Sequence, residues 1–142
     1  MSQQDVELVR QVAEGLPSDV SELATQEVVN TLLDRLDPDF VFVIDATEDL
    51  TGVGGDYPGP EGFLAAMREW LSVWESYERW DEEFIDVGEG RVLTLSRDKG
   101  RLRGGGEIEQ KTAAIWTVRD GKIARVHAFQ DRGRARRAVG LG

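Results

Sequence analysis

Residues 121–131, GKIARVHAFQD, contain the only histidine of the chain, His127, four positions before Asp131. Histidine exchanges protons near neutral pH, and a nearby carboxylate could hold its ring in place. The two residues are therefore candidates for acid–base catalysis. A structural interpretation of each stays open: His127 as a hydrogen-bonded strand residue, and Asp131 as the N-cap of a short helix over the arginine-rich residues that follow, which we favour.

Other catalytic chemistries find no support in the sequence. Cysteine is absent and histidine occurs once, so neither a disulfide framework, nor a thiolate nucleophile, nor a structural zinc site is expected. No glycine-rich phosphate-binding loop stands between a predicted strand and a predicted helix. We therefore expect no metal and no cofactor.

The charge balance excludes several classes of partner. The chain has 17 lysines and arginines against 27 aspartates and glutamates, a formal net charge of −10, which repels the phosphates of nucleic acids. No run reaches the roughly 20 apolar residues of a membrane helix, and the polar amino terminus lacks the features of a secretory signal. We expect neither nucleic acid nor membrane as a partner, and a cytoplasmic location. The arginines of residues 131–142 leave an anion-binding patch open beside a solvated helix end.

The first half of the chain indicates helices around one strand. Apolar residues at helical spacing predict helices over 5–16 and 19–36. Residues 39–45, DFVFVID, predict a strand, and residues 46–60 a glycine-rich loop. A third helix begins at residues 59–60, Gly-Pro. This helix places four large apolar side chains on one face: Phe63, Met67, Trp70 and Trp74.

The second half of the chain predicts an antiparallel meander. Four β-favouring runs cover residues 76–87, 91–103, 107–119 and 122–129, and the turn sequences GEG, GGG and DG separate them. A sheet of this kind packs one face against helices. The sequence therefore predicts a single α+β domain over residues 1–142, a length that suffices for one core.

The two-residue turn at residues 120–121, Asp-Gly, predicts a register for the last two strands. Arg119 then pairs with Lys122, Trp116 with Arg125, Ala114 with His127 and Thr112 with Phe129. Trp116, Arg125, His127 and Phe129 share one face in this register, and we assign that face to the interior. The other face carries small and β-branched residues and is assigned to a dimer interface. The opposite assignment stays open.

The pattern of the chain resembles the NTF2-like superfamily, in detail its SnoaL-like, polyketide cyclase-like branch. The resemblance is carried by LDPDFVFVID (36–45), GPEGFLAAMREWLSVWE (59–75), EEFIDVGEGRVLTL (82–95) and AAIWTVRDGKIARVHAFQDRGRARRAVGL (113–141). It implies a cone-shaped fold, in which a curved mixed or antiparallel sheet wraps around N-terminal helices and one long helix, with a short C-terminal helix. It also implies an apolar pocket and a homodimer formed through the sheet.

The resemblance adds candidate site residues. Asp45 ends the first strand where ketosteroid isomerases place their general base, although a strand-end aspartate also caps turns. Asp131 matches the approximate position of an acid–base aspartate in polyketide cyclases. The first helix contains no tyrosine, and Ala114 stands near the position of the acid in the isomerase oxyanion hole. Ketosteroid isomerisation by the known arrangement is therefore not expected.

Two classes of function remain open. One is a cofactor-free acid–base enzyme of the cyclase, isomerase or hydrolase class, acting on an apolar carbonyl, polyketide or terpenoid-like ligand. Asp45 and His127 are its predicted catalytic residues. Its predicted ligand-binding residues are Tyr57, Trp70, Trp74, Trp116, Arg125 and Phe129. The other class is a non-catalytic ligand-binding or dimerisation module. A protein-interaction scaffold, whose tryptophans would fill the interior, is a third hypothesis.

Overall fold

A computed structural model describes residues 2–16, 26–45 and 55–141 of the chain. The helices are α1 (Ser2–Glu14), α3 (Gln26–Asp34), α4 (Gly59–Ser72) and α5 (Arg132–Ala138). The strands are β1 (Leu36–Asp45), β2 (Gly55–Pro58), β3 (Trp74–Gly88), β4 (Arg91–Leu102), β5 (Glu107–Arg119) and β6 (Lys122–Phe129). None of the described helices is long and apolar enough to cross a membrane.

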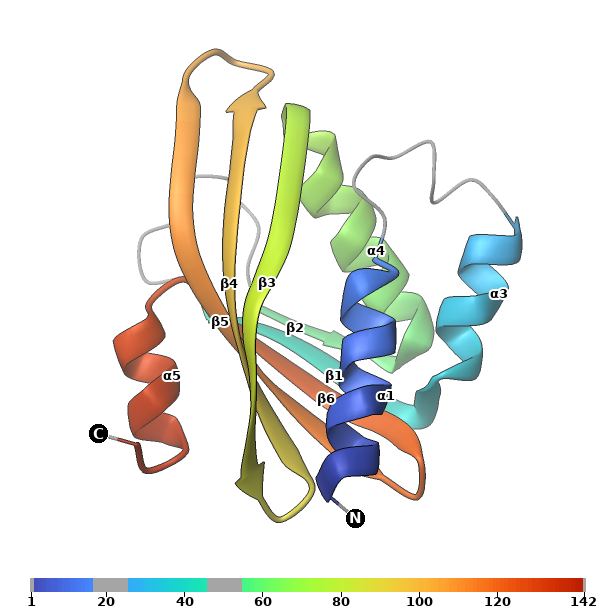
Figure 1. Ribbon diagram of the computed structural model, residues 1–142. Helices are drawn as coiled ribbons and strands as arrows, with labels where there is room; N and C mark the ends of the chain where they lie inside the picture. The colour runs from blue at the N-terminus through green and yellow to red at the C-terminus, as the bar shows by residue number, and fades with distance from the viewer. Residues whose placement is uncertain (1, 17–25, 46–54, 142) are drawn as a thin grey trace.

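The six strands form one curved mixed sheet in the order β2-β1-β6-β5-β4-β3. Strands β3 to β6 are the predicted antiparallel meander, and β1 joins β6 in parallel. Helices α1, α3 and α4 lie on one face of the sheet, called the inner face, whereas α5 lies on the outer face (Figure 1). The predicted α+β class, with a short C-terminal helix, is confirmed.

Helix boundaries follow local sequence signals. Helix α4 has a proline in its first turn and Glu61 beside it, where the helix dipole favours an acid. Helix α5 begins after Asp131, whose side chain accepts a hydrogen bond of 2.8 Å from the Gly133 amide. The predicted N-cap role of Asp131 is therefore confirmed.

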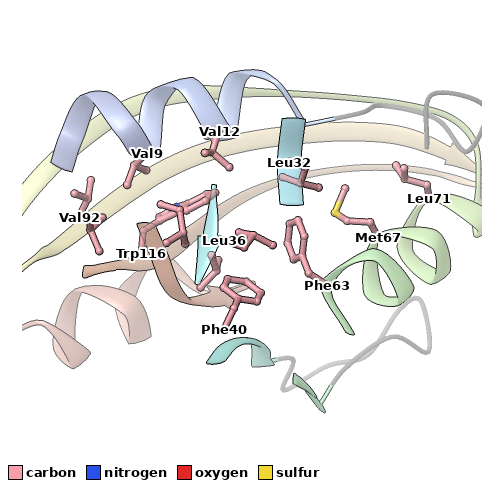
Figure 2. Packing of buried hydrophobic residues seen from close by; sticks show 14 residues of the cluster. Val9, Val12, Leu32, Leu36, Phe40, Phe63, Met67, Leu71, Val92 and Trp116 are labelled. Carbon is pink, nitrogen blue, oxygen red and sulfur yellow. The ribbon is translucent and has the colours of Figure 1, made fainter. Parts of the chain in front are cut away.

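Both faces of the sheet are covered by hydrophobic packing. On the inner face, side chains of α1, α3 and α4 pack against the strands around Phe40 and Trp116 (Figure 2). Phe40 meets Phe63 edge to face at a centroid distance of 5.4 Å, a favourable aromatic geometry. On the outer face, a smaller cluster surrounds Ala135 of α5. Its other buried members are Leu93, Leu95, Ala113, Ile115 and Phe129.

The register predicted for the last hairpin is correct at the turn and wrong beyond it. Arg119 pairs with Lys122 as predicted, and both turn residues have positive φ, 54° at Asp120 and 76° at Gly121. The register then shifts, so that Ile115 rather than Ala114 pairs with His127. A β-bulge at Ala124 causes the shift, because one extra residue in β6 moves every later side chain to the other face.

Two further predictions about the first half need correction. Residues 46–60 were expected to form a loop, but residues 55–58 form β2, in which Tyr57 pairs with Phe42 of β1. Glycine and proline usually indicate a loop, so the sequence did not predict this short strand. β2 lies at the edge of the sheet, where both residues are tolerated. The predicted helix over 19–36 is described from Gln26 onward, and its first part lies outside the described residues.

Candidate functional site

A cavity of about 540 Å³ lies between the inner face of the sheet, α4 and the end of α1. Most of its wall is apolar and aromatic. The apolar contributors from α1, from the residues directly after it and from α4 are Ala13, Leu16, Phe63, Ala66, Met67 and Trp70. Those from the strands include Phe42, Ile44, Ala114, Trp116, Val126 and Ala128. A pocket of this size and composition suits an apolar small molecule.

Polar side chains gather at one end of the cavity because of strand alternation. In the observed register, Asp98 of β4 pairs with Arg79 of β3 and with Gln110 of β5. Ser96, two residues earlier in β4, pairs with Asp81 and Thr112. Directly opposed residues point to the same face of a sheet, so these two rows of three residues lie side by side on the inner face. All six residues line the cavity.

Asp98 is the most unusual group of the site. Its residue is only 3% exposed, and its Oδ2 accepts a 3.0 Å hydrogen bond from the Tyr77 hydroxyl. Its Oδ1 is buried and has no hydrogen-bond partner among the described residues. Burial raises the pKa of the Asp98 carboxyl, while Tyr77, Gln110 and the charge of Arg79 partly offset the rise. Asp98 therefore keeps its proton to higher pH than an exposed aspartate, and its Oδ1 can accept a further hydrogen bond.

Tyr77 holds Asp98 from within an aromatic cluster. Burial, and then the charge of Asp98, raise the pKa of the Tyr77 hydroxyl, so it remains a hydrogen-bond donor. The ring of Tyr77 lies 6.0 Å from that of Trp70 and 5.1 Å from that of Trp74, centroid to centroid. Gly100, which pairs with Tyr77, makes room for this cluster, since a Cβ there would lie 2.6 Å from Cε3 of Trp74.

Asp81 has a different environment from Asp98. Its Oδ1 lies 2.6 Å from Nη2 of Arg79 and accepts a 2.6 Å hydrogen bond from the Ser96 hydroxyl. Arg79 also donates to the carbonyl oxygen of Ala13 at 3.3 Å, near the end of α1. Asp81 is thus paired with a cation, whereas the partner of Asp98 is the neutral hydroxyl of Tyr77. Two carboxyl groups with such different surroundings are suited to separate acid and base roles.

The predicted ligand-binding residues fall into two groups. Trp70 and Trp116 line the cavity, and Phe129 lies both at the cavity and in the outer cluster. The others do not line it. Trp74 is buried behind Tyr77, and the Tyr57 hydroxyl donates to Oε2 of Glu69 at 2.9 Å, away from the cavity.

The bulge in β6 separates His127 and Arg125 from the cavity. Their partners in β5 are Ile115, which belongs to the outer cluster, and Thr117, which strand alternation places on the same face. The His127 ring stacks on Phe129 at a centroid distance of 4.1 Å. Asp45 is the last residue of β1 and pairs through its backbone with Phe129, while its side chain lies outside the described part of the structure.

Sequence reasoning missed the polar end of the cavity. Tyr77, Arg79 and Asp81 alternate with period two in SYERWDE, and Ser96 and Asp98 do the same in the next strand. This periodicity places all five side chains on one face of a hairpin, and it was the available signal. It is easily overlooked, because charged residues on a strand are usually solvent-exposed.

Among the described residues, no cluster of three or more histidine, aspartate or glutamate residues could hold a metal ion.

Comparison with known proteins identifies a family and a fold. The family model described as the SnoaL-like domain matches residues 19–126. No curated protein matches the chain.

Solved structures with TM-scores near 0.7 share the fold over nearly the whole chain. TerC, co-crystallised with polyporic acid, has a TM-score of 0.71 and 19% identity, covering 96% of this chain and 98% of its own. An NTF2-like protein of unknown function from Burkholderia pseudomallei K96243 has a TM-score of 0.71 and 18% identity, and the match covers 96% of this chain and 98% of that protein. A provisionally assigned SnoaL-like polyketide cyclase from Jannaschia sp. CCS1 has a TM-score of 0.70 and 18% identity, and the match covers 99% of this chain and 94% of that protein. These similarities show the cone-shaped NTF2-like fold.

Proposed function

Since the chain belongs to the family of SnoaL-like domains within the NTF2-like superfamily, we propose that it binds an apolar small molecule in the cavity and catalyses a cofactor-free acid–base reaction on it. The ligand is of a carbonyl-bearing, polyketide or terpenoid-like type. The volume of about 540 Å³ and the aromatic wall support a ligand of this kind.

The observation that carries the proposal is that Asp98 lines an apolar cavity and has a buried Oδ1 without a hydrogen-bond partner among the described residues. In its neutral form this carboxyl group donates a hydrogen bond and then a proton to a carbonyl oxygen of the ligand. A second carboxylate removes a proton from the adjacent carbon, which yields an enol. Asp81, paired with Arg79, stands in the same cavity for this role. Enol formation is the step that isomerases and cyclases of carbonyl compounds share.

Proton exchange tests this chemistry without knowledge of the natural substrate. The protein is incubated with α-tetralone in D₂O, and the loss of the proton signal next to the carbonyl is followed by NMR. We expect the wild type to accelerate the exchange and Asp98→Asn to reduce the acceleration about 100-fold or more, the usual contribution of a general acid or base. Glu83→Gln, an exposed acid of the same hairpin that does not line the cavity, is the matched control.

The outcomes separate the two classes of function. Exchange that is equally fast in Asp98→Asn would overturn the role of Asp98. Binding of α-tetralone by the wild type without any exchange would instead favour the non-catalytic ligand-binding module. Asp45→Asn and His127→Ala belong in the same assay, because both residues remain predicted catalytic residues. If only Asp45→Asn reduced the exchange, Asp45 at the end of β1 would be the general base instead.

We also propose a cytoplasmic homodimer that associates through the outer face of the sheet. The half-buried Thr117 and the exposed Arg125 form one cross-strand pair on that face, and a new carboxylate there would repel its copy across a two-fold interface. Sedimentation velocity is expected to give a dimer for the wild type and for Gln3→Glu on α1, and a monomer for Thr117→Glu. A monomeric wild type at micromolar concentration would contradict the dimer.

A further inference from the structure

The charges around the cavity are unevenly matched. The charged side chains that line it are Glu14 of α1, Arg79 and Asp81 of β3, and Asp98 of β4. Arg79 is paired with Asp81 at 2.6 Å. Among the described residues of the wall, no other cation balances Glu14 and Asp98. An anion entering this cavity would lose its hydration and gain no charged partner.

The free Oδ1 of Asp98 is the second, independent observation. This oxygen is buried and has no hydrogen-bond partner among the described residues, and Asp98 as a residue lines the cavity. Such an oxygen costs free energy in the empty protein, and a ligand that donates a hydrogen bond to it, or places a positive charge against it, offsets that cost. The aromatic rings of Trp70 and Tyr77 stand at the same end of the cavity, with Tyr77 in contact with the carboxylate itself.

From these observations we propose that the cavity selects ligands by charge, cation above neutral above anion, and that it binds apolar amines with the ammonium group on Oδ1 of Asp98. Two attractions act on such a group. One is the carboxylate in a setting of low dielectric constant. The other is the π-electron density of Trp70 and Tyr77, which attracts cations most strongly where water is excluded. The proposal uses the cavity of the proposed function but does not depend on its chemistry, so an amine would act as a competitive inhibitor.

A consequence for pH follows from the groups that line the cavity together with Asp98. These are Tyr77, Arg79 and Asp81 of β3 and Glu14 of α1, whereas α4 contributes Trp70 and β5 contributes Gln110, both uncharged. Burial raises the pKa of Asp98, so a cation that binds to its ionised form expels a proton. The affinity for a permanent cation therefore rises with pH above the usual range of an aspartate, while the affinity for a neutral ligand does not.

Three probes with the same ring and head groups of similar size test the charge order. They are phenyltrimethylammonium, tert-butylbenzene and benzenesulfonate, and their binding is followed by tryptophan fluorescence, because Trp70 and Trp116 line the cavity. At pH 8 we expect phenyltrimethylammonium to bind about tenfold more tightly than tert-butylbenzene. Benzenesulfonate should bind more weakly than both.

The variant Asp98→Asn should remove the preference and leave the cationic and neutral probes with similar affinity. Glu83→Gln changes the net charge of the protein equally and should keep the preference, which excludes a long-range effect. Should Asp98→Asn not fold, the rise in affinity for phenyltrimethylammonium from pH 5 to pH 8 in the wild type tests the same point.

Several results would overturn the proposal: equal or tighter binding of the neutral probe to the wild type, a preference that survives in Asp98→Asn, or an affinity for the cation that does not change with pH. If tert-butylbenzene binds and α-tetralone exchanges its protons while no charge order is found, only this inference fails. If no probe binds and no exchange occurs, the cavity itself is not a ligand site and the proposed function fails with it.

Discussion

At the scale of single residues, one carboxyl group combines properties that rarely occur together in a stable protein. Asp98 is buried, it keeps one oxygen without a partner among the described residues, and burial raises its pKa. Groups of this kind reduce stability and are retained where they serve a function. The loss of folding stability that a buried carboxyl causes therefore supports a functional role for Asp98 at the cavity.

This cost predicts how stability depends on pH. Because the pKa of Asp98 is raised in the folded state, the folded protein binds this proton more tightly than the unfolded chain. Its contribution is thus most favourable below the unfolded pKa of about 3.9 and is lost as the pH rises through the raised pKa. Asp98→Asn cannot ionise and keeps an acceptor for Tyr77. We expect it to be more stable than the wild type near neutral pH, by on the order of 1 kcal/mol, with the difference vanishing toward about pH 3.

Thermal unfolding of both proteins between pH 3 and pH 8 checks this expectation. Glu83→Gln serves as the control, since its side chain is exposed and its difference from the wild type should stay small throughout. A lower melting temperature of Asp98→Asn at neutral pH would show that ionised Asp98 stabilises the fold, which contradicts a destabilising effect of its burial.

From the sequence, a candidate residue was chosen because its type is rare in the chain. In the structure, the candidate is a residue of a common type in an unusual, buried environment. His127 attracted attention as the only histidine, yet it lies on the outer face against Phe129. Asp98 is one of many acidic residues, and only its burial distinguishes it. Burial depends on the packing of α1 and α4 over the strands, which no local pattern around Asp98 reveals.

At the scale of elements, one inserted residue decides which side chains of β6 face the cavity. The turn sequences located the four strands of the meander correctly, since glycine and aspartate turns have specific backbone requirements. The bulge at Ala124 carries no comparable signal, because its sequence reads as ordinary strand. For this reason the strand positions could be predicted, while the faces of Arg125 and His127 could not.

Cysteine pairs test the observed register directly. The chain has no cysteine of its own, and residues directly opposed across antiparallel strands approach within the range of a disulfide bond. The double variant Ile115→Cys with His127→Cys should form a disulfide under mild oxidation. Ala114→Cys with His127→Cys, the pair expected without a bulge, should form much less. Mass spectrometry of the oxidised proteins measures both, and the reverse order would contradict the bulge.

At the scale of the whole molecule, the chain leaves a cavity of about 540 Å³ between its helices and its sheet, beside well-packed clusters on both faces. The tryptophans that could have filled it as a scaffold line or surround it instead. A fold with this pattern of helices and meander could be predicted from the sequence. The position of the polar rows within it could not, since it depends on how β3, β4 and β5 align across the curved sheet.

Filling the cavity should exchange function for stability. Ala114 lines it and is only half-buried, so Ala114→Leu adds apolar contacts where space is available. We expect a gain in stability of about 1 kcal/mol and a loss of phenyltrimethylammonium and α-tetralone binding. Ala138→Leu, an exposed position on α5, is the control and should leave binding unchanged. Undiminished binding to Ala114→Leu, by fluorescence titration, would place the ligand elsewhere.

The parallel pairing of β1 with β6 has a consequence for synthesis of the protein on the ribosome. β1 ends at Asp45, and β6 begins at Lys122, so most of the chain must be made before β1 can pair with β6. The meander from β3 to β6 needs only local contacts and should form earlier. Pulse-labelled hydrogen exchange during refolding is expected to protect the amides of β3 to β5 before those of β1. The wall that Phe42 and Ile44 share with Val126 and Ala128 would then close last, so the cavity stays incomplete until the final strand of the nascent chain is in place.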